Sequence, residues 1–259
     1  MEHKDILSHV EDHVLHLTLN RPDSLNAFSP DMMDGLLEGV QLAKSSPDIR
    51  AILLTGAGRA FSAGGDVKSM GVPSPARVYD HIGHFNEVIL AMAKVEVPIV
   101  AAVHGWAAGA GVNLALASDI IYAAQDSKFV LSFSKIGLIS DGGGLFFLPR
   151  TIGLYRAKEV LFNAEPFTAE QAMQWGMVNR TFPADQLMDE AKNYAKKLAA
   201  GPTRSVSMIK TIANRALVSD LAAVLEMERT SQTVTQSSAD HKEGVQAFVE
   251  KRPPKFTGQ

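Results

Sequence analysis

The pattern of apolar and polar positions predicts strands and a helix in the first part of the chain. Residues Ile6 to Val10 and Val14 to Leu19 alternate apolar with polar side chains, which predicts two antiparallel strands. Ser29 and Pro30 stand where a helix N-cap and a first helical residue belong. Apolar residues then recur at helical spacing, at Met33, Leu36, Leu37, Val40 and Ala43. This segment is therefore expected to be an amphipathic helix.

The next segment alternates predicted strands with predicted helices, and two of its strands run into glycine loops. The expected elements are a strand from Ala51 to Thr55, a helix marked by Phe85, Val88, Ile89 and Met92, a strand from Pro98 to Val103, a helix from Ala108 to Ser118 and a strand from Ile120 to Ala123. Gly56-Ala57-Gly58 follows the first strand and His104-Gly105 follows the second. This alternation predicts an α/β fold with a mostly parallel sheet.

The chain changes character after Gly144, where the only strand predicted is around Met177 to Phe182. Thr168 to Gln171 forms a capping box, and Leu187, Ala191, Tyr194, Ala195 and Leu198 mark another helix. Residues Thr203 to Phe248 are almost wholly compatible with helix. We expect a core over residues 1–200 and a helical subdomain over residues 201–259.

Composition narrows the functional classes. The 259 residues are 46% hydrophobic and carry a formal net charge of -3 without a basic run, so we expect one compact unit that does not bind nucleic acid. The chain has no cysteine, which excludes thiolate catalysis and cysteine-ligated metals. The N-terminus lacks the apolar stretch of a signal peptide, and polar residues interrupt the apolar region from Val97 to Ala124. We expect a cytoplasmic protein without a membrane span.

Three glycine loops follow predicted strands, at Gly56 to Asp66, Gly105 to Gly111 and Asp141 to Gly144. Ligands of open α/β sheets bind at such strand ends, and glycines let a ligand approach free backbone N–H groups, although glycine loops also serve as plain turns. The dinucleotide motif does not fit, because Phe61 and Leu114 occupy its last glycine position. A Walker A lysine is also absent from the sequence.

Two other kinds of site remain open from the residues alone. Ala60 to Gly64 differs from the G-x-S-x-G nucleophile elbow only at its first position, so a serine hydrolase that uses Ser62 is an alternative. His81 and His84 are spaced to share a metal, but no HExxH motif or added carboxylate accompanies them. We therefore expect no metal.

Three segments together resemble the crotonase (enoyl-CoA hydratase/isomerase) superfamily along nearly the whole chain. They are Asn20-Arg21-Pro22 with Leu25-Asn26-Ala27, Phe61 to Asp66, and Val103 to Gly111. The resemblance implies the ClpP-like crotonase fold, with repeated ββα turns and a C-terminal helical region. It also implies a homotrimer or a hexamer of two trimers. The substrate would be an acyl-CoA thioester, with coenzyme A as part of the substrate and no separate cofactor.

The resemblance also implies roles for particular residues. The backbone N–H groups of Ala63 and Ala110 would form an oxyanion hole for the thioester, although many family members have glycine in place of Ala110. The residues that would bind CoA are Gly64, Gly65, Asp66, Val67, Phe248 and Lys251, the last two often from a neighbouring subunit. The acyl pocket would include Met70, Asn113, Phe133 and Leu138.

One departure from the family pattern bears on the reaction. Hydratases of the family carry two glutamates, and Asn113 and Phe133 stand at the matching positions. Asparagine cannot titrate and phenylalanine cannot hydrogen-bond, whereas water addition requires groups that move protons. The carboxylate that remains is Asp141, which read alone could simply cap a turn.

The segment from Phe129 to Ile139 and the tail from Lys255 to Gly258 resemble the family branch that isomerises a ring epoxide in phenylacetate degradation. A single carboxylate suits a double-bond shift, because one group can remove a proton from C2 and return it at C4. We therefore expect an acyl-CoA isomerase of fatty-acid or phenylacetate metabolism with Asp141 as acid and base. The alternatives are a hydratase, a serine hydrolase and a non-catalytic acyl-CoA binder.

Overall fold

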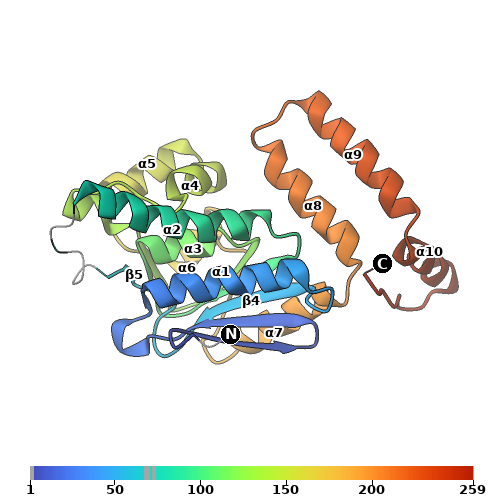
Figure 1. The fold of residues 1–259 in the computed structure, drawn as a ribbon, viewed down its shortest axis with the longest axis horizontal. Helices are drawn as coiled ribbons and strands as arrows, with labels where there is room; N and C mark the ends of the chain where they lie inside the picture. Colours follow the sequence, from blue (N-terminus) through green and yellow to red (C-terminus); the bar gives the residue numbers. More distant parts are fainter. Residues whose placement is uncertain (1–2, 67–70, 72–73, 259) are drawn as a thin grey trace.

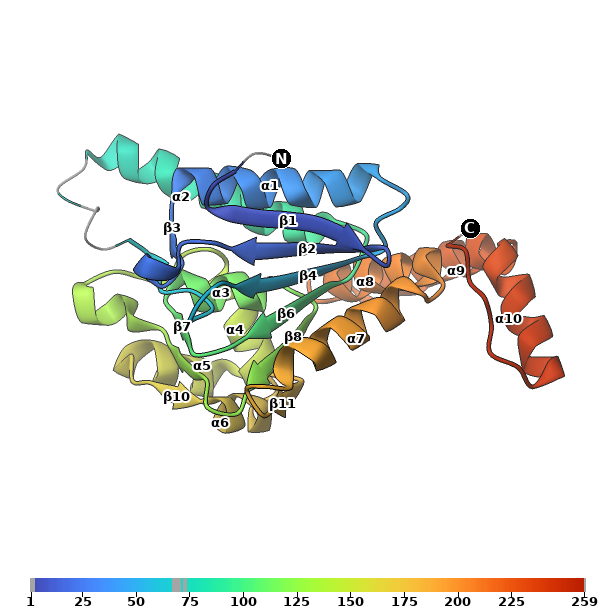
Figure 2. The ribbon, with the colours of Figure 1, turned by 90° about the horizontal axis from the view of Figure 1, so that it is seen from below.

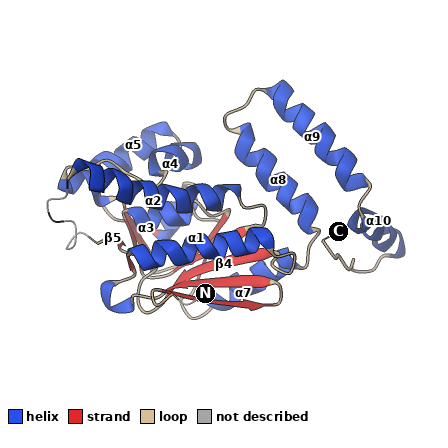
Figure 3. Ribbon diagram, viewed as in Figure 1, coloured by secondary structure: helices blue, strands red, loops and turns tan. Residues whose placement is uncertain are grey.

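A computed structural model describes residues 3–66, 71 and 74–258, so the predictions for Val67 and Met70 lie outside the described residues. Its main sheet has six strands in the order β1 (Ile6–Glu11), β2 (Val14–Leu19), β4 (Ala51–Gly56), β6 (Ile99–Val103), β8 (Ile120–Ala124) and β11 (Arg180–Phe182). β1 and β2 are antiparallel, and every later pair in this order is parallel. The predicted α/β class with a mostly parallel sheet is confirmed (Figure 3).

Helices cover both faces of this sheet (Figure 2). α1 (Pro30–Ser45) and α2 (Pro75–Lys94) lie on one side and α7 (Leu187–Ala199) on the other. Successive strand residues point to opposite faces, so Leu54 packs in the core under α1 and α2 while Leu53 packs in the core under α7. β4 is consequently buried at every residue, which explains why its sequence is an apolar run.

The predicted helix starts follow local hydrogen bonding. Ser29 is the N-cap of α1, and its Oγ accepts a hydrogen bond from the N–H of Met32 at 3.1 Å. Thr168 and Gln171 form a complete capping box at the start of α6 (Ala169–Gln174). Both predictions are confirmed, because each depends on residues within one turn of the helix.

Short strands form two further sheets close to the glycine loops. β3 (Ala27–Phe28) pairs in parallel with β5 (Gly64–Gly65), and β7 (Trp106–Ala108), β9 (Lys128–Val130) and β10 (Phe167–Thr168) form a three-stranded sheet. The helix predicted from Ala108 to Ser118 begins later, as α3 (Ala110–Leu116). Gly109 separates β7 from α3 with φ 51° and ψ -122°, a conformation that no helical residue adopts.

The remaining helices include α4 (Gly144–Ile152), α5 (Leu154–Asn163), α8 (Thr203–Ala216), α9 (Leu221–Gln236) and α10 (Ala239–Glu250), and two short 3₁₀ helices are η1 (Pro22–Ser24) and η3 (Ser132–Ile136). α8, α9 and α10 confirm the helical prediction for Thr203 to Phe248, and they extend away from the sheet (Figure 1). Within the described part of the chain, no helix has both the length and the apolar character needed to cross a bilayer.

Candidate active site

The first glycine loop is fixed by Asn26, which comes from the opening segment. The amide of Asn26 donates to the carbonyl oxygens of Ala57 and Ala60, at 2.8 Å each, and its Oδ1 accepts from the N–H of Arg21 at 2.8 Å. None of the residue is exposed, and its φ of 54° places it in the left-handed region that asparagine tolerates. The opening segment therefore holds the loop that leads into β5.

The first and second glycine loops lie against each other. A Cβ atom on Gly64 would lie 2.5 Å from the carbonyl oxygen of Ala108 and 2.8 Å from the backbone nitrogen of Ala110. Gly64 also has a φ of 78°, so only glycine fits this crossing without strain. The close packing brings the backbone of β5 next to the start of α3.

The N–H of Ala63 has a different role from the one predicted. It donates to the carbonyl oxygen of Leu25 at 2.8 Å. The prediction that Ala63 supplies an N–H to a thioester is contradicted by this bond, because the hydrogen already has an acceptor. The next N–H, that of Gly64, donates to Oγ of Ser62 at 3.0 Å.

Ser62 is placed for structure. None of its surface is exposed, and its hydroxyl donates to the carbonyl oxygen of Asn26 at 2.8 Å while accepting the N–H of Gly64. A nucleophilic serine needs an exposed hydroxyl and a histidine that accepts its proton. Since the Ser62 hydroxyl donates to a carbonyl group, the geometry argues against the serine-hydrolase alternative.

Ala110 begins α3, so its N–H has no acceptor within the helix. The residue is almost fully buried at the junction of the two loops. Phe133, on η3, is half-buried and packs beside this point, since its Cζ would lie 3.7 Å from a Cβ atom on Gly109. The start of α3 thus combines a backbone donor with an apolar neighbour, and the role of Ala110 toward a thioester stays a prediction.

Asp141 lies in the turn before α4 and is held next to α3. Its backbone carbonyl oxygen accepts a hydrogen bond from Nδ2 of Asn113 at 2.9 Å. Its Oδ1 is buried and has no hydrogen-bond partner in the structure. Burial raises the pKa of the Asp141 carboxyl, while its own backbone N–H, the Asn113 amide and the His81 imidazole oppose this shift. A partly desolvated carboxyl of this kind can accept a proton and return it.

Three predicted ligand-binding residues do not present exposed side chains beside Asp141. Asn113 has no exposed surface, so it lies behind the site and does not line the acyl pocket as predicted. Phe248 and Lys251 lie at the end of α10, which is remote from α3 and α4 within the chain (Figure 1). Phe248 is 85% exposed, so little of its side chain packs against the rest of this chain. The structure does not bring these two residues to Asp141.

Asp66 and Leu138, two further predicted ligand-binding residues, lie near the loops. Asp66 lies with its Oδ2 3.8 Å from Nη2 of Arg21, in the opening segment. The N–H of Leu138, which is 47% exposed, donates to the carbonyl oxygen of Phe133 at 2.9 Å. His84 pairs with Asp34 at 3.0 Å, which argues against the shared metal site with His81. The CoA-binding roles of Gly64, Gly65 and Asp66 stay predictions.

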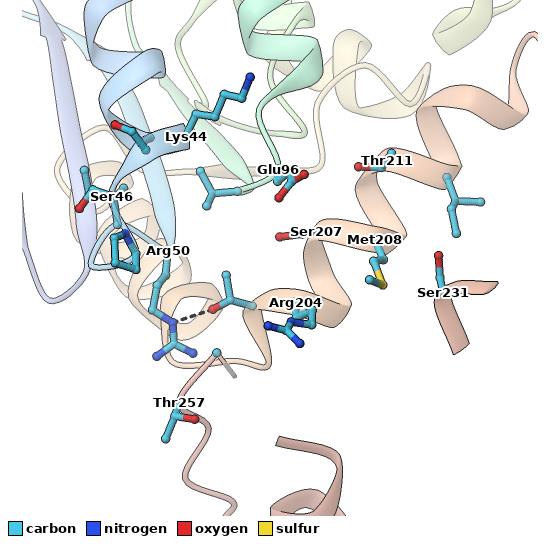
Figure 4. A pocket seen from close by; sticks show the side chains of 18 residues that line it. Lys44, Ser46, Arg50, Glu96, Arg204, Ser207, Met208, Thr211, Ser231 and Thr257 are labelled. Atoms are coloured by element: carbon cyan, nitrogen blue, oxygen red, sulfur yellow. Dashed lines mark hydrogen bonds between the residues drawn. The ribbon is translucent and has the colours of Figure 1, made fainter. Parts of the chain in front are cut away.

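A cavity of about 470 Å³ lies where α8 meets the end of α1 (Figure 4). Arg50 faces α8 there, and its Nε donates to Oγ1 of Thr203 at 2.6 Å. The lining residues include neither Asp141 nor the glycine loops. We therefore place the candidate active site at the loops, because Asn113 of α3 bonds the Asp141 turn to the helix that begins at Ala110.

Comparisons with known proteins identify the family of the chain. Residues 9–259 match the family model described as enoyl-CoA hydratase/isomerase. The chain is 43% identical to 1,2-epoxyphenylacetyl-CoA isomerase of Escherichia coli, over 98% of each chain, and 34% identical to mitochondrial enoyl-CoA hydratase of Pongo abelii, over 94% of this chain and 83% of that protein. An enoyl-CoA hydratase structure from Polaromonas superposes with a TM-score of 0.93 at 33% identity, covering 97% of this chain and 99% of the other.

The fold is that of a crotonase-type protein, so the predicted crotonase fold is confirmed. The chain belongs to the enoyl-CoA hydratase/isomerase family.

Proposed function

We propose that the protein is an acyl-CoA isomerase that moves a carbon–carbon double bond through a thioester enolate, with Asp141 as the acid and base. One observation carries this proposal: Asp141 presents a buried carboxyl oxygen without a hydrogen-bond partner, and burial raises its pKa. The positions that bear glutamate in hydratases hold Asn113 and Phe133. A single proton carrier suits isomerisation, which consumes no water.

The reaction can be written with one proton carrier. The Asp141 carboxylate removes a proton from C2 of a 3-enoyl thioester, and the electron pair of that C–H bond delocalises onto the thioester oxygen. The protonated Asp141 then donates at C4, while the C3–C4 double bond shifts to C2–C3. Backbone donors stabilise the enolate oxygen, and each such donor commonly lowers the barrier by about 3 kcal/mol.

The two backbone donors are proposed to be Ala110 and Gly65. Ala63 and Gly64 use their N–H groups inside the protein, so the next N–H along the first loop is that of Gly65. Gly65 follows directly on Gly64, whose backbone lies against that of Ala110. This replaces Ala63 in the predicted pair.

The substrate is proposed to be a 3-enoyl-CoA or the ring epoxide of phenylacetyl-CoA. The likeness to 1,2-epoxyphenylacetyl-CoA isomerase, 43% identical over nearly the whole chain, supports the second. Both substrates need the same proton abstraction next to a thioester. Coenzyme A enters as part of the substrate, and no further cofactor is needed for this chemistry.

We also propose a homotrimer, or a hexamer of two trimers, in which Phe248 and Lys251 reach CoA in the adjacent subunit. Support comes from the end of α10, where Phe248 is 85% and Val249 74% exposed. Side chains of this size gain free energy when an interface or a ligand covers them.

Product analysis with 3-hexenoyl-CoA and crotonyl-CoA, side by side, tests the proposal. We expect conversion of 3-hexenoyl-CoA to 2-hexenoyl-CoA with hydration of crotonyl-CoA slower by at least about 10² fold, the scale of one missing acid or base. Turnover of crotonyl-CoA equal to that of 3-hexenoyl-CoA would favour the hydratase alternative. The non-catalytic acyl-CoA binder would be favoured if the protein bound both thioesters but converted neither of them, nor the ring epoxide.

A further inference from the structure

Asn113 connects α3 to the turn that carries Asp141. Its Nδ2 donates to Oγ of Ser140 at 3.0 Å and to the backbone carbonyl oxygen of Asp141 at 2.9 Å. A carbonyl oxygen can only accept, so the amide nitrogen must face the turn. This fixes the orientation of the Asn113 side chain, which is wholly buried.

We propose that Asn113 is the positioning residue of Asp141, holding the turn so that the carboxyl group meets the substrate at the start of α3. This inference rests on the proposed function, because it requires Asp141 to be the proton carrier. Asn113 itself does not touch the substrate, since it lies behind the turn.

The packing around the turn supports this role. A Cβ atom on Gly144 would lie 2.2 Å from Oγ of Ser140 and 2.4 Å from Oδ1 of Asn113, so the turn lies directly on the amide. On the other side, the ring of Phe85 from α2 would lie 2.1 Å from a Cβ atom on Gly142. The turn is therefore enclosed by α3 and α2, and its backbone has little room to shift.

The unpaired Oδ1 atom of Asn113 also supports the positioning role. Oδ1 is buried and has no hydrogen-bond partner in the structure. An unpaired buried acceptor destabilises the fold, and a leucine at this position would avoid that loss. The amide is useful here because its Nδ2 satisfies two acceptors of the turn. A glutamate or aspartate would place a further acceptor against the carbonyl oxygen of Asp141.

The pKa of Asp141 gives a readout that should not change if Asn113 only stabilised the fold. Burial raises the pKa of the carboxyl, and the Asn113 amide counteracts part of that rise. Within the described residues, His81 of α2 is the titratable group that acts on Asp141 electrostatically, also lowering the pKa of Asp141. Loss of the Asn113 amide should therefore raise the pKa further and shift the acidic limb of the kcat–pH profile to higher pH.

The test compares Asn113→Leu and Asn113→Asp with Asn214→Leu. Asn214 makes a matched control, because it lies on an exposed part of α8. Its amide donates to the carbonyl oxygen of Ala93 in α2. We expect Asn113→Leu to lower kcat by about 10² fold, the scale of a 1 Å misplacement, with KM within a few fold. Asn113→Asp keeps the shape of the side chain but adds a like charge, so its acidic limb should also move upward. Asn214→Leu should match the parent in both respects.

Two results would overturn the inference. Measuring Asp141→Asn together with the Asn113 variants distinguishes them. If Asp141→Asn is inactive but a folded Asn113→Leu or Asn113→Asp has parental kcat and an unmoved acidic limb, Asn113 does not position the base. If Asp141→Asn keeps parental kcat, the base is another residue, and the proposed function fails together with the role of Asn113. Circular dichroism and thermal unfolding establish which variants are folded.

Discussion

Nζ of Lys210 lies 2.7 Å from Oδ2 of Asp119, in an ion pair that joins α8 to the connection between α3 and β8. Lys210 also donates to the carbonyl oxygens of Met92 and Val97, and Asp119 accepts from the N–H of Ile99 at 2.7 Å. Burial lowers the pKa of Lys210 and raises that of Asp119. Both shifts favour the neutral forms, so desolvation outweighs the attraction between the two charges.

Removing one member of this pair should destabilise the fold. Lys210→Met leaves the Asp119 carboxylate buried without its counter-charge, which should lower the free energy of unfolding by about 3–5 kcal/mol. Asp119→Asn combined with Lys210→Met should recover most of the loss, because no buried charge remains. Urea unfolding of the single and double variants measures both. A Lys210→Met protein as stable as the parent would show that the pair does not stabilise the fold.

Asp141→Asn should abolish isomerisation while leaving thioester binding within a few fold. Asparagine keeps the size of aspartate but cannot carry a proton, so kcat should fall by about 10⁴ fold or more with little change in KM. Asp126→Asn, at an exposed turn, is the control and should match the parent. If Asp141 only closes a turn, its asparagine variant would be as active as the parent.

The pH dependence of kcat should follow the ionisation of Asp141. The base is active as carboxylate, and its pKa is raised above the ordinary 3.8 by burial. Activity should consequently disappear as pH falls through this raised pKa, at a higher pH than for an exposed aspartate. A kcat–pH profile with a flat acidic limb down to pH 4 would contradict the raised pKa.

Ser62→Ala should affect stability more than catalysis. The variant leaves the carbonyl oxygen of Asn26 and the N–H of Gly64 without the hydroxyl they bond, which should cost about 1–3 kcal/mol of unfolding free energy. Loss of a catalytic nucleophile would instead lower kcat by several powers of ten. Thermal unfolding and kcat, measured on the same preparation, separate the two roles.

Gly65 can be tested as a backbone donor by comparing two substitutions. Proline removes the N–H, whereas alanine retains it, and Gly65 is not among the glycines with positive φ. Gly65→Pro should lower kcat by about 10²–10³ fold, the effect of losing one oxyanion donor, and Gly65→Ala should stay close to the parent. Equal kcat values for the two variants would place the donor elsewhere.

The sequence predicts the main sheet and helix α1 well, because their patterns are local. Ser29 and Thr168 cap helices through atoms one turn away, and β4 is an uninterrupted apolar run. The strands β7, β9 and β10 were not predicted, since each spans two or three residues and periodicity has no meaning over such lengths. Their pairing depends on contacts between distant segments, such as Trp106 with Lys128.

The dependence on contacts between distant segments also explains which features of the site were predicted and which were missed. The three glycine loops could be found from sequence, because glycines after strands are visible in it. The use of the Ala63 N–H depends on the carbonyl oxygen of Leu25, which only the folded chain brings near. The pattern at Asn113 shows that the residue cannot titrate, but not that its amide bonds to the Asp141 turn.

The bonds of Asn26 also restrict how this enzyme could be redesigned. Its amide spans the carbonyl oxygens of Ala57 and Ala60, so an insertion or deletion between them would remove at least one bond at a wholly buried residue. A library that varies the length of this loop would therefore yield mostly misfolded proteins. Efforts to change the acyl specificity should keep that length constant and vary side chains on η3 and α2.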